Sequence, residues 1–330
     1  MDKLGGNVGL NVARVPPNPP TPKESPVPSS ARKPHVSYSF LAGAEFAIRF
    51  PGHQLPGVNK WNETPSEERP VPVVLIHGTA GSGTTNWFTL APYLTNRGFS
   101  VFTVTYGALP DAKFPMSELG GLRDIAENSV PEVAGFVDKV LAATGAEQVD
   151  LVGHSQGCVV AGAIAKHARP GKVRKVVSLA SPWHGVGSAR LERMLTSMRL
   201  RQLVAGAFLA GESLVRGSTF LTELWEPDGT PYARGVEYTN IATRFDEFVW
   251  PHMTSLVEPP QHGDYSVRNI VLQQGCMLDF VDHAALPSDP RAVDYVLDAL
   301  DPGAGHKIRC LPVAPVHGGI LPGWLTDRRG

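Results

Sequence analysis

The sequence has little of several features that would place it in a specialised class of protein. It has only 3 cysteines in 330 residues, too few for a disulfide-rich scaffold. The formal net charge is -1, so the charge balance does not favour nucleic acid or an anionic membrane as a partner. No apolar run is long enough to span a bilayer. The remaining composition, with 42% hydrophobic residues, allows a large buried core.

The N-terminal residues 1–37 are rich in proline and have almost no apolar periodicity. Such a segment cannot bury enough apolar surface to fold by itself. We predict a disordered or extended arm over residues 1–37, followed by one domain over residues 38–330. The arm also lacks the apolar core of a signal peptide. We therefore expect either that a leader has been removed or that export uses another signal.

From about Pro70 onwards, apolar runs alternate with segments of helical periodicity. The predicted strands are residues 71–76, 99–106, 149–154, 173–180, 236–242 and 269–273. The predicted helices are residues 87–94, 130–144 with Ser129 as its cap, 156–168 and 290–300. This alternation predicts an α/β fold with a mostly parallel sheet and helices on both faces. Active sites of such sheets lie at the carboxyl ends of the strands.

The alternation breaks over residues 183–231. Within this segment, residues 191–215 hold many leucines and methionines among several arginines. We predict inserted helices over the end of the sheet, which would form a cap or a wall for an acyl chain. The alternative is that these apolar residues belong to the core.

The most informative stretch is Val149–Gly162. An apolar segment with strand character ends in Gly153–Gly157 (GHSQG) and passes directly into residues suited to a helix. A serine on such a sharp turn has a strained backbone and an exposed hydroxyl, and its glycine neighbours must lack side chains. We predict that Ser155 is a nucleophile. The alternative is a serine in an ordinary surface turn, because this pattern alone occurs often by chance.

A glycine-rich loop, His77–Gly83, follows the apolar residues 71–76. It could hold a phosphate, but it has no lysine at the P-loop position and no G-x-G-x-x-G spacing. We predict an oxyanion loop in which the backbone N–H of Thr79 points at developing negative charge, with the Thr79 hydroxyl as a second donor. The alternative is a plain strand-to-helix turn.

A serine nucleophile needs a base, and the base needs a carboxylate that fixes its tautomer. In the α/β-hydrolase order the acid follows a late strand and the histidine comes last. Asp246 and His283 meet both conditions. The rival acids are Asp264, which precedes a strand, and Asp282, which adjoins His283 and would point away from it.

The three cysteines have different expected roles. Cys158 follows Ser155 on a predicted buried helix, where we expect a structural thiol. Cys276 and Cys310 lie in loop-like surroundings near the C-terminus. If paired, they would stabilise the C-terminal segment by about 3 to 4 kcal/mol and indicate an oxidising compartment. The residues alone leave this pairing open.

Five segments together match the pattern of a known family: Val74–Thr79, Asn86–Trp87, Gly153–Gly157, Tyr238–Glu247 and Val281–Ala284. On these segments the chain resembles the bacterial class 2 lipases, which are related in pattern to fungal lipases of the B type. The resemblance spans roughly residues 70–300. It implies an α/β-hydrolase fold and carboxylic ester hydrolysis.

The resemblance also implies roles for individual residues. Ser155, Asp246 and His283 would form the catalytic triad, and the N–H groups of Thr79 and Gln156 would form the oxyanion hole. Cys276 and Cys310 would form a disulfide, because the family bridges a cysteine before the catalytic histidine to one near the C-terminus. In secreted relatives a signal peptide is expected; for this chain we expect a secreted protein or one of the cell envelope.

We therefore expect a monomeric serine hydrolase that acts on triacylglycerols or other hydrophobic esters through an acyl-Ser155 intermediate. We expect transient contact with a lipid surface, but no nucleic-acid partner, cofactor or metal. His252 and His262 could together begin a metal site, but no third ligand has a suitable spacing. Two alternatives are an acyltransferase with the same triad and a non-catalytic binding protein on the same scaffold. Product partition with added alcohol tests the first, and a fluorophosphonate probe of Ser155 tests the second.

Overall fold

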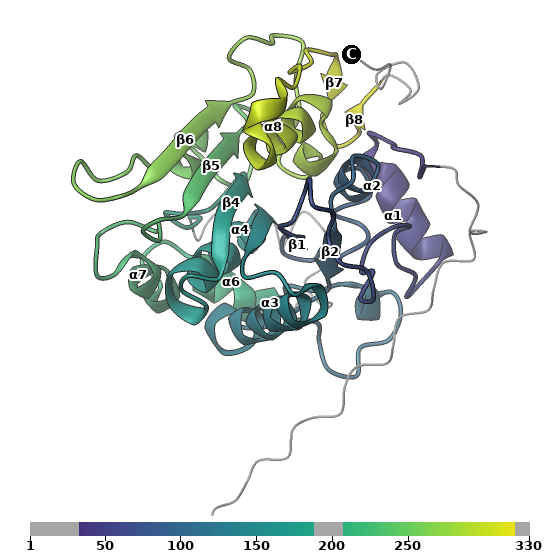
Figure 1. The fold of residues 1–330 in the computed structure, drawn as a ribbon. Coiled ribbons are helices and arrows are strands. Elements are labelled where there is room, and N and C mark those ends of the chain that lie inside the picture. The colour runs from purple at the N-terminus through teal and green to yellow at the C-terminus, as the bar shows by residue number, and fades with distance from the viewer. Residues whose placement is uncertain (1–32, 188–206, 321–330) are drawn as a thin grey trace, which may run out of the picture.

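The computed structural model describes residues 33–187 and 207–320. Its centre is a six-stranded sheet of order β2-β1-β3-β4-β5-β6, in which all neighbouring strands run parallel (Figure 1). The strands are β1 (Val73–Ile76), β2 (Val101–Val104), β3 (Val149–His154), β4 (Val173–Leu179), β5 (Glu237–Ala242) and β6 (Ser266–Val271). The predicted α/β fold with a parallel sheet is confirmed.

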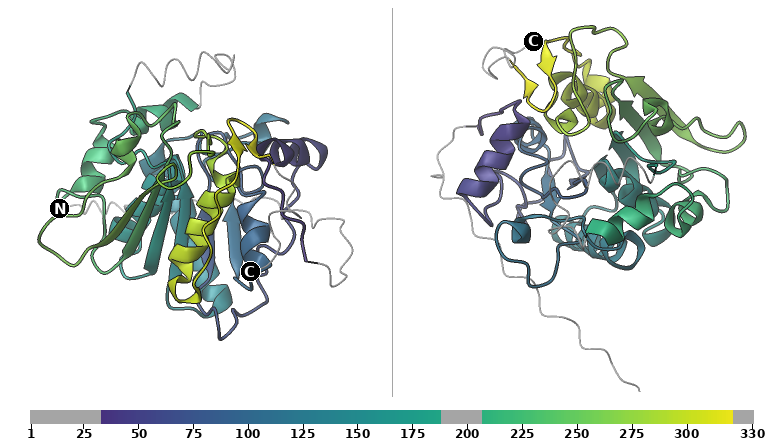
Figure 2. Two further views of the ribbon diagram at one scale, coloured as in Figure 1. Left: turned by 90° about the horizontal axis from the view of Figure 1, so that it is seen from above. Right: turned by 180° about the vertical axis from the view of Figure 1, so that it is seen from behind.

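Helices cover both faces of the sheet. They are α1 (Phe40–Arg49), α2 (Leu90–Thr95), α3 (Val130–Thr144), α4 (Gln156–Ala163), α6 (Ala207–Leu214), α7 (Thr219–Trp225) and α8 (Pro290–Leu300). One apolar core joins the sheet to α3, α4 and α7, and a second joins it to α2 and α8. Helix α8, yellow in Figure 2 (left), runs along the sheet. Successive residues of β1 alternate between the two cores: Val74 and Ile76 belong to the first, Val73 and Leu75 to the second. No helix within the described ranges is both long and apolar enough to cross a membrane.

Of the two predicted ends of α3, the C-terminal end is confirmed and the N-terminal cap is not. Gly145 ends the helix in the left-handed conformation (φ 71°), as the sequence predicts. The predicted cap at Ser129 is wrong, because Ser129 already has helical backbone and makes no capping hydrogen bond. It closes a π-helical turn, Ile125–Ser129, which Asp124 caps by accepting a hydrogen bond from the Glu127 N–H at 2.8 Å.

Two peripheral elements differ from the sequence prediction. Strand β6 begins at Ser266 and ends at Val271, earlier than the predicted 269–273, because its partly polar first residues pair with β5 at the edge of the sheet. Helix α1 was not predicted. It buries only Gly43 and Ala47, while Leu41 and Ile48 are exposed, so its apolar residues do not form a single buried stripe.

The C-terminal described residues return to α1. A short hairpin of β7 (Val313–Ala314) and β8 (Gly318–Gly319) lies beside the N-terminal end of that helix (Figure 1). The Gly319 N–H donates to the Tyr38 carbonyl at 2.7 Å, and the Phe40 N–H donates to the His317 carbonyl at 2.9 Å. The first and last described segments therefore stabilise each other.

The last residues of the predicted arm pack on α2. Val36 is buried, and the Asn96 side chain donates to the Pro34 carbonyl at 2.7 Å. The Thr89 hydroxyl donates to the Ser37 carbonyl at 2.5 Å. Residues 33–37 are thus part of the domain surface, and residues 1–32 of the arm lie outside the described residues.

The insertion predicted over residues 183–231 is described only in part, since residues 188–206 lie outside the described ranges. In its described part, Phe220, Leu221 and Leu224 of α7 belong to the core shared with α3 and α4. Lys166, in the turn that follows α4, donates from Nζ to the carbonyls of Leu224 at 3.0 Å and Thr230 at 2.7 Å. The apolar residues of α7 are therefore core residues.

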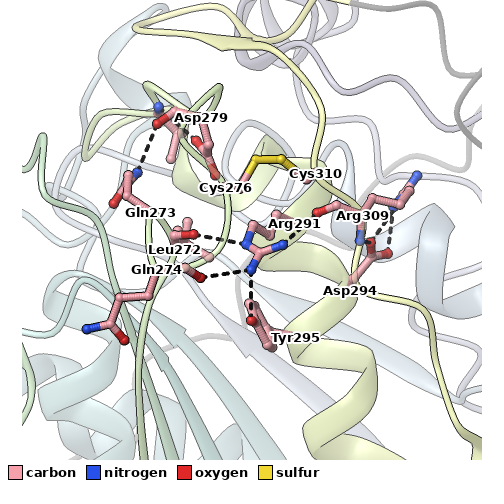
Figure 3. Close-up of a disulfide and its surroundings, with 11 residues drawn as sticks. Leu272, Gln273, Gln274, Cys276, Asp279, Arg291, Asp294, Tyr295, Arg309 and Cys310 are labelled. Atoms are coloured by element: carbon pink, nitrogen blue, oxygen red, sulfur yellow. Dashed lines mark hydrogen bonds and ion pairs between the residues drawn. A yellow bond between two sulfur atoms is a disulfide. The ribbon is translucent and has the colours of Figure 1, made fainter.

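A disulfide joins Cys276, in the segment after β6, to Cys310 after α8 (Figure 3). Arg309 donates from Nε and Nη2 to the carboxylate of Asp294 on α8, both at 2.7 Å. Arg291, on the same helix, donates to the carbonyl oxygens of Leu272 and Gln274 at 2.9 and 3.0 Å. Both segments that the disulfide joins are therefore also bound to α8.

Removing this disulfide should lower stability. We expect replacement of both Cys276 and Cys310 by serine to reduce the free energy of unfolding by about 3 to 4 kcal/mol, because the bond closes a segment with a sequence separation of 34. Urea unfolding measures the change, and the wild type under reducing conditions is the matched control. A loss below about 1 kcal/mol would mean that the contacts to α8 fix this region without the disulfide.

Candidate active site

Three side chains from loops at the carboxyl ends of strands form one hydrogen-bonded row. Ser155 follows β3, Asp246 follows β5, and His283 lies between β6 and α8. The Ser155 Oγ lies 2.9 Å from Nε2 of His283. The other ring nitrogen, Nδ1, lies 2.9 and 3.0 Å from the two carboxylate oxygens of Asp246. The fold therefore brings together the nucleophile, base and acid that the sequence predicts.

The sharp turn Gly153–Gly157 between β3 and α4, which we call the elbow, has the strained geometry expected between a strand and a helix. The backbone of Ser155 has φ 52° and ψ −123°, a region that side-chain-bearing residues rarely adopt. A Cβ on Gly153 would lie 2.7 Å from the Cys158 backbone, and one on Gly157 would lie 2.7 Å from the His77 carbonyl oxygen. Both contacts are too short for a real side chain, so glycine is required on either side of the serine.

Asp246 is held in place by its own loop. The N–H groups of Phe248 and Val249 donate to its Oδ1 at 2.9 and 2.7 Å. The side chain is almost fully buried, and the Phe248 ring stands edge-on to His283, with ring centres 5.0 Å apart. The carboxylate is therefore fixed toward the imidazole.

The segment that carries His283 is bound to the loops after β5 and β6. The Thr243 hydroxyl donates to the Val281 carbonyl at 2.6 Å, and Gln273 donates from Nε2 to the Asp279 carbonyl at 3.2 Å. The Glu247 carboxylate accepts a hydrogen bond from the His283 N–H at 3.1 Å. These contacts hold the histidine over the carboxyl end of β5.

The environment of His283 favours its protonated form. Burial by itself would lower the pKa of His283, but the charge and hydrogen bond of Asp246, with the charges of Glu247 and Asp282, hold that pKa above its ordinary value. Surrounded by these carboxylates, the ring can accept a proton, and the resulting imidazolium is stabilised.

Two further side chains connect the elbow to its surroundings. The His154 ring lies 3.0 Å from the His283 carbonyl oxygen through Nε2 and 3.0 Å from Oδ1 of Asn86 through Nδ1. Asn86 also accepts a hydrogen bond from the Gly78 N–H at 3.3 Å. Burial lowers the pKa of His154 well below its ordinary value, so the ring is neutral. A neutral ring carries a single N–H, and a backbone carbonyl can only accept, so with the proton on Nε2 His154 donates to the His283 carbonyl. This is a structural hydrogen bond, as expected from the sequence.

The loop after β1 packs against the elbow, where a Cβ on Gly78 would lie 3.1 Å from the Cβ of Ser155. Within residues 33–187 and 207–320, neither the N–H of Thr79 nor that of Gln156 donates a hydrogen bond to another group. Gln156 is also the first residue of α4, whose N-terminal end favours negative charge. The Thr79 hydroxyl, expected as a second donor, instead donates to Oε1 of Gln156 at 2.5 Å.

The rival residues have other environments. Asp264 is exposed. The carboxylate of Asp282 accepts hydrogen bonds from the N–H groups of Ala285 and Val316 at 3.0 and 2.7 Å, which fixes the loop around His283. His77 is fully buried, and burial lowers its pKa to about 4. In the described part of the chain, no three His, Cys, Asp or Glu side chains are grouped to hold a metal ion.

Sequence reasoning gave no role to Glu247 or Asn86, although both lie in segments that carry the family resemblance. Each makes its contact across the fold: Glu247 to the main chain of His283, Asn86 to the loop after β1 and to His154. The available signal was a second carboxylate directly after the predicted acid, and an asparagine shortly after the predicted oxyanion loop.

Comparison with known proteins gives a consistent family. A family model described as the alpha/beta hydrolase fold matches residues 71–235. A stretch of 121 residues, 34% of this chain, is 32% identical to a triacylglycerol lipase of Pseudarthrobacter phenanthrenivorans and equally to one of Burkholderia plantarii. This stretch spans only 34% and 30% of those two lipases. Aspergillus fumigatus lipase B has the same fold, with a TM-score of 0.53 and 20% identity over 75% of this chain and 55% of that one.

Proposed function

Because the chain belongs to the alpha/beta hydrolase fold family, we propose that it is a serine carboxylic ester hydrolase, either a triacylglycerol lipase or a lipid esterase. The observation that carries the proposal is the hydrogen-bonded row of Ser155, His283 and Asp246. The two triacylglycerol lipases that match about a third of the chain support the substrate class.

In the first half of the proposed reaction, His283 takes the proton of the Ser155 hydroxyl through Nε2 while Oγ attacks the ester carbonyl carbon. Asp246 keeps the proton on Nδ1 and stabilises the imidazolium that forms. The carbonyl oxygen becomes negatively charged and is stabilised by the N–H groups of Thr79 and Gln156. Collapse of this intermediate breaks the ester C–O bond, and His283 returns its proton to the departing alcohol.

The second half repeats these steps with water. His283 removes a proton from a water molecule, whose oxygen attacks the acyl carbon bound to Ser155. The same N–H groups stabilise the second oxyanion. Its collapse releases the carboxylic acid and returns the proton to Ser155. No cofactor or metal enters the proposed cycle.

Exposed apolar side chains on the two loops that carry Asp246 and His283 support a hydrophobic ester as substrate. Phe245 and Phe280 are both exposed, with ring centres 5.3 Å apart, and they flank the acid and the histidine in sequence. Met277 is 87% exposed, and Leu278 next to it is also exposed. Apolar surface of this kind is typical of sites that contact hydrophobic ligands or lipid surfaces.

The substrate class is tested by a series of p-nitrophenyl esters of increasing acyl length. We expect kcat/KM to rise by about tenfold from acetate to butyrate, since two buried CH₂ groups contribute about 0.8 kcal/mol each, and to keep rising up to the length that the site can cover. Rates measured above and below the solubility limit of each ester show whether aggregated substrate is preferred. A rate that is highest for acetate and falls with every added carbon would contradict a lipid substrate.

The same assay distinguishes the two alternatives. An acyltransferase would divert most of the acyl group to added alcohol at low alcohol concentration, whereas a hydrolase releases mainly the free acid. A binding protein on the same scaffold would turn over no ester. The arrangement at Ser155 favours hydrolysis over the binding protein, because a pure binding site needs no base within 2.9 Å of the serine oxygen.

We further propose that the protein is a monomer of an oxidising compartment, secreted or in the cell envelope. The disulfide between Cys276 and Cys310 supports the oxidising compartment, because such bonds form and persist mainly in oxidising surroundings. Recovery of the protein only in the cytosolic fraction of its source cells would contradict this location.

A further inference from the structure

Glu247 makes an unusual contact for a residue next to the proposed catalytic acid. It lies at the rim of the site with part of its surface in solvent, yet its carboxylate accepts a hydrogen bond from the His283 N–H at 3.1 Å. A parallel bridge between Phe245 and Asp282 brings the two loops together. Consecutive carboxylates therefore bind one histidine: Asp246 its ring and Glu247 its main chain.

We infer that Glu247 is a positioning residue for the proposed reaction: it fixes the backbone of His283 and places a second negative charge beside the imidazole that becomes protonated. This inference rests on the proposed function, since it assumes that His283 is the base. It assigns to Glu247 a role that is separate from that of Asp246, which orients the ring itself.

The main chain of His283 is held from both sides. Its N–H donates to Glu247, and its carbonyl oxygen lies 3.0 Å from Nε2 of His154. A ring attached to a backbone fixed at both groups has few ways to move away from Ser155. Loss of the Glu247 carboxylate would leave the N–H of His283 without this acceptor and allow the loop to shift.

The charge of Glu247 adds to that of the groups around the ring. Asp246 and Asp282 face His283 with the same sign, and the neutral ring of His154 lies with its centre 5.1 Å away. Arg244 and His252 lie on the same loop as Asp246. Burial raises the pKa of Glu247, and the hydrogen bond from His283 opposes that rise.

The direction of the pH effect follows from these charges. The carboxylates raise the pKa of His283, and below that pKa the ring is protonated and cannot accept the serine proton. Activity therefore increases as pH rises through this pKa. Removing the charge of Glu247 lowers the pKa of His283 and moves the acidic limb of the pH profile to lower pH.

The experiment compares Glu247→Gln, Glu247→Ala and the control Glu68→Gln, which changes an exposed carboxylate away from the site. It measures kcat/KM for a soluble p-nitrophenyl ester across the pH range. For Glu247→Gln we expect an acidic limb about half a pH unit lower, with a plateau within about threefold of wild type because the amide oxygen still accepts from His283. For Glu247→Ala we expect the same shift and a plateau about tenfold lower. Glu68→Gln should match wild type.

An NMR titration of ¹³C-labelled histidine provides a readout that does not need turnover. The His283 signal is assigned by its loss in His283→Gln, and its pKa should be about half a unit lower in Glu247→Gln than in wild type. An unchanged His283 pKa in that variant overturns the charge role. Equal plateaus for the Ala and Gln variants overturn the positioning role. If wild type turns over no ester, the proposed function fails, while the titration still decides whether Glu247 acts on His283.

Discussion

Replacement of Ser155 by alanine is expected to reduce kcat for ester hydrolysis by roughly 10⁵- to 10⁶-fold. The reason is that alanine removes the only atom that attacks the ester carbonyl in the proposed reaction. What activity remains would come from substrate binding and from the N–H groups of Thr79 and Gln156. The measurement is the initial rate of p-nitrophenyl ester hydrolysis by the purified variant.

The fold should survive this change. Alanine accepts the same backbone strain at φ 52° as serine, and only one hydroxyl is lost. The thermal midpoint should therefore stay within a few degrees of wild type. The matched control is Ser66→Ala, an exposed serine whose loss should leave the rate unchanged. A Ser155→Ala variant that keeps more than about a hundredth of the activity would rule out Ser155 as the nucleophile.

Replacement of Asp246 by asparagine is expected to lower kcat by about 10⁴-fold without unfolding the protein. In the structure, Oδ1 accepts the N–H groups of Phe248 and Val249. An asparagine that keeps these two bonds must turn its NH₂ group toward Nδ1 of His283. The ring would then accept at Nδ1 and carry its proton on Nε2, facing Ser155, where it cannot take the serine proton.

The Asp246→Asn variant tests whether Asp246 orients the His283 ring, separately from any effect on the stability of the fold. The matched control Asp111→Asn changes an exposed aspartate with positive φ, a conformation that asparagine tolerates, and should retain full activity. Steady-state kinetics and thermal unfolding of both variants give the comparison. If Asp246→Asn loses less than about tenfold, the tautomer of His283 is set by another group, and Asp246 is not the orienting acid.

The parts of the fold that the sequence predicts are those fixed by local constraints. Strand β1 is buried on both faces and must read as a continuous apolar run. The elbow needs glycine on both sides of Ser155, because Gly153 packs against the backbone of Cys158 in α4 and Gly157 against the backbone of Ile76 and His77. Asp246 and His283 follow from their order along the chain and from the rule that sites lie at the carboxyl ends of parallel strands.

The parts that the sequence does not predict depend on contacts between distant segments. The contact of Glu247 with His283 requires the bridge between the loops after β5 and β6, which no local pattern specifies. The hydroxyl of Thr79 donates to the side chain of Gln156, which comes from another strand-to-helix turn. Helix α1 is stabilised partly by the hairpin of β7 and β8 at the far end of the described chain.

The central claim is that Ser155, activated by His283, is the nucleophile. Mass spectrometry of the protein treated with a fluorophosphonate and then digested tests this most directly. The account predicts one phosphonyl adduct per chain, on the peptide that contains Ser155, and none in Ser155→Ala. An adduct on a different residue, or an active protein that forms no adduct at all, would contradict it.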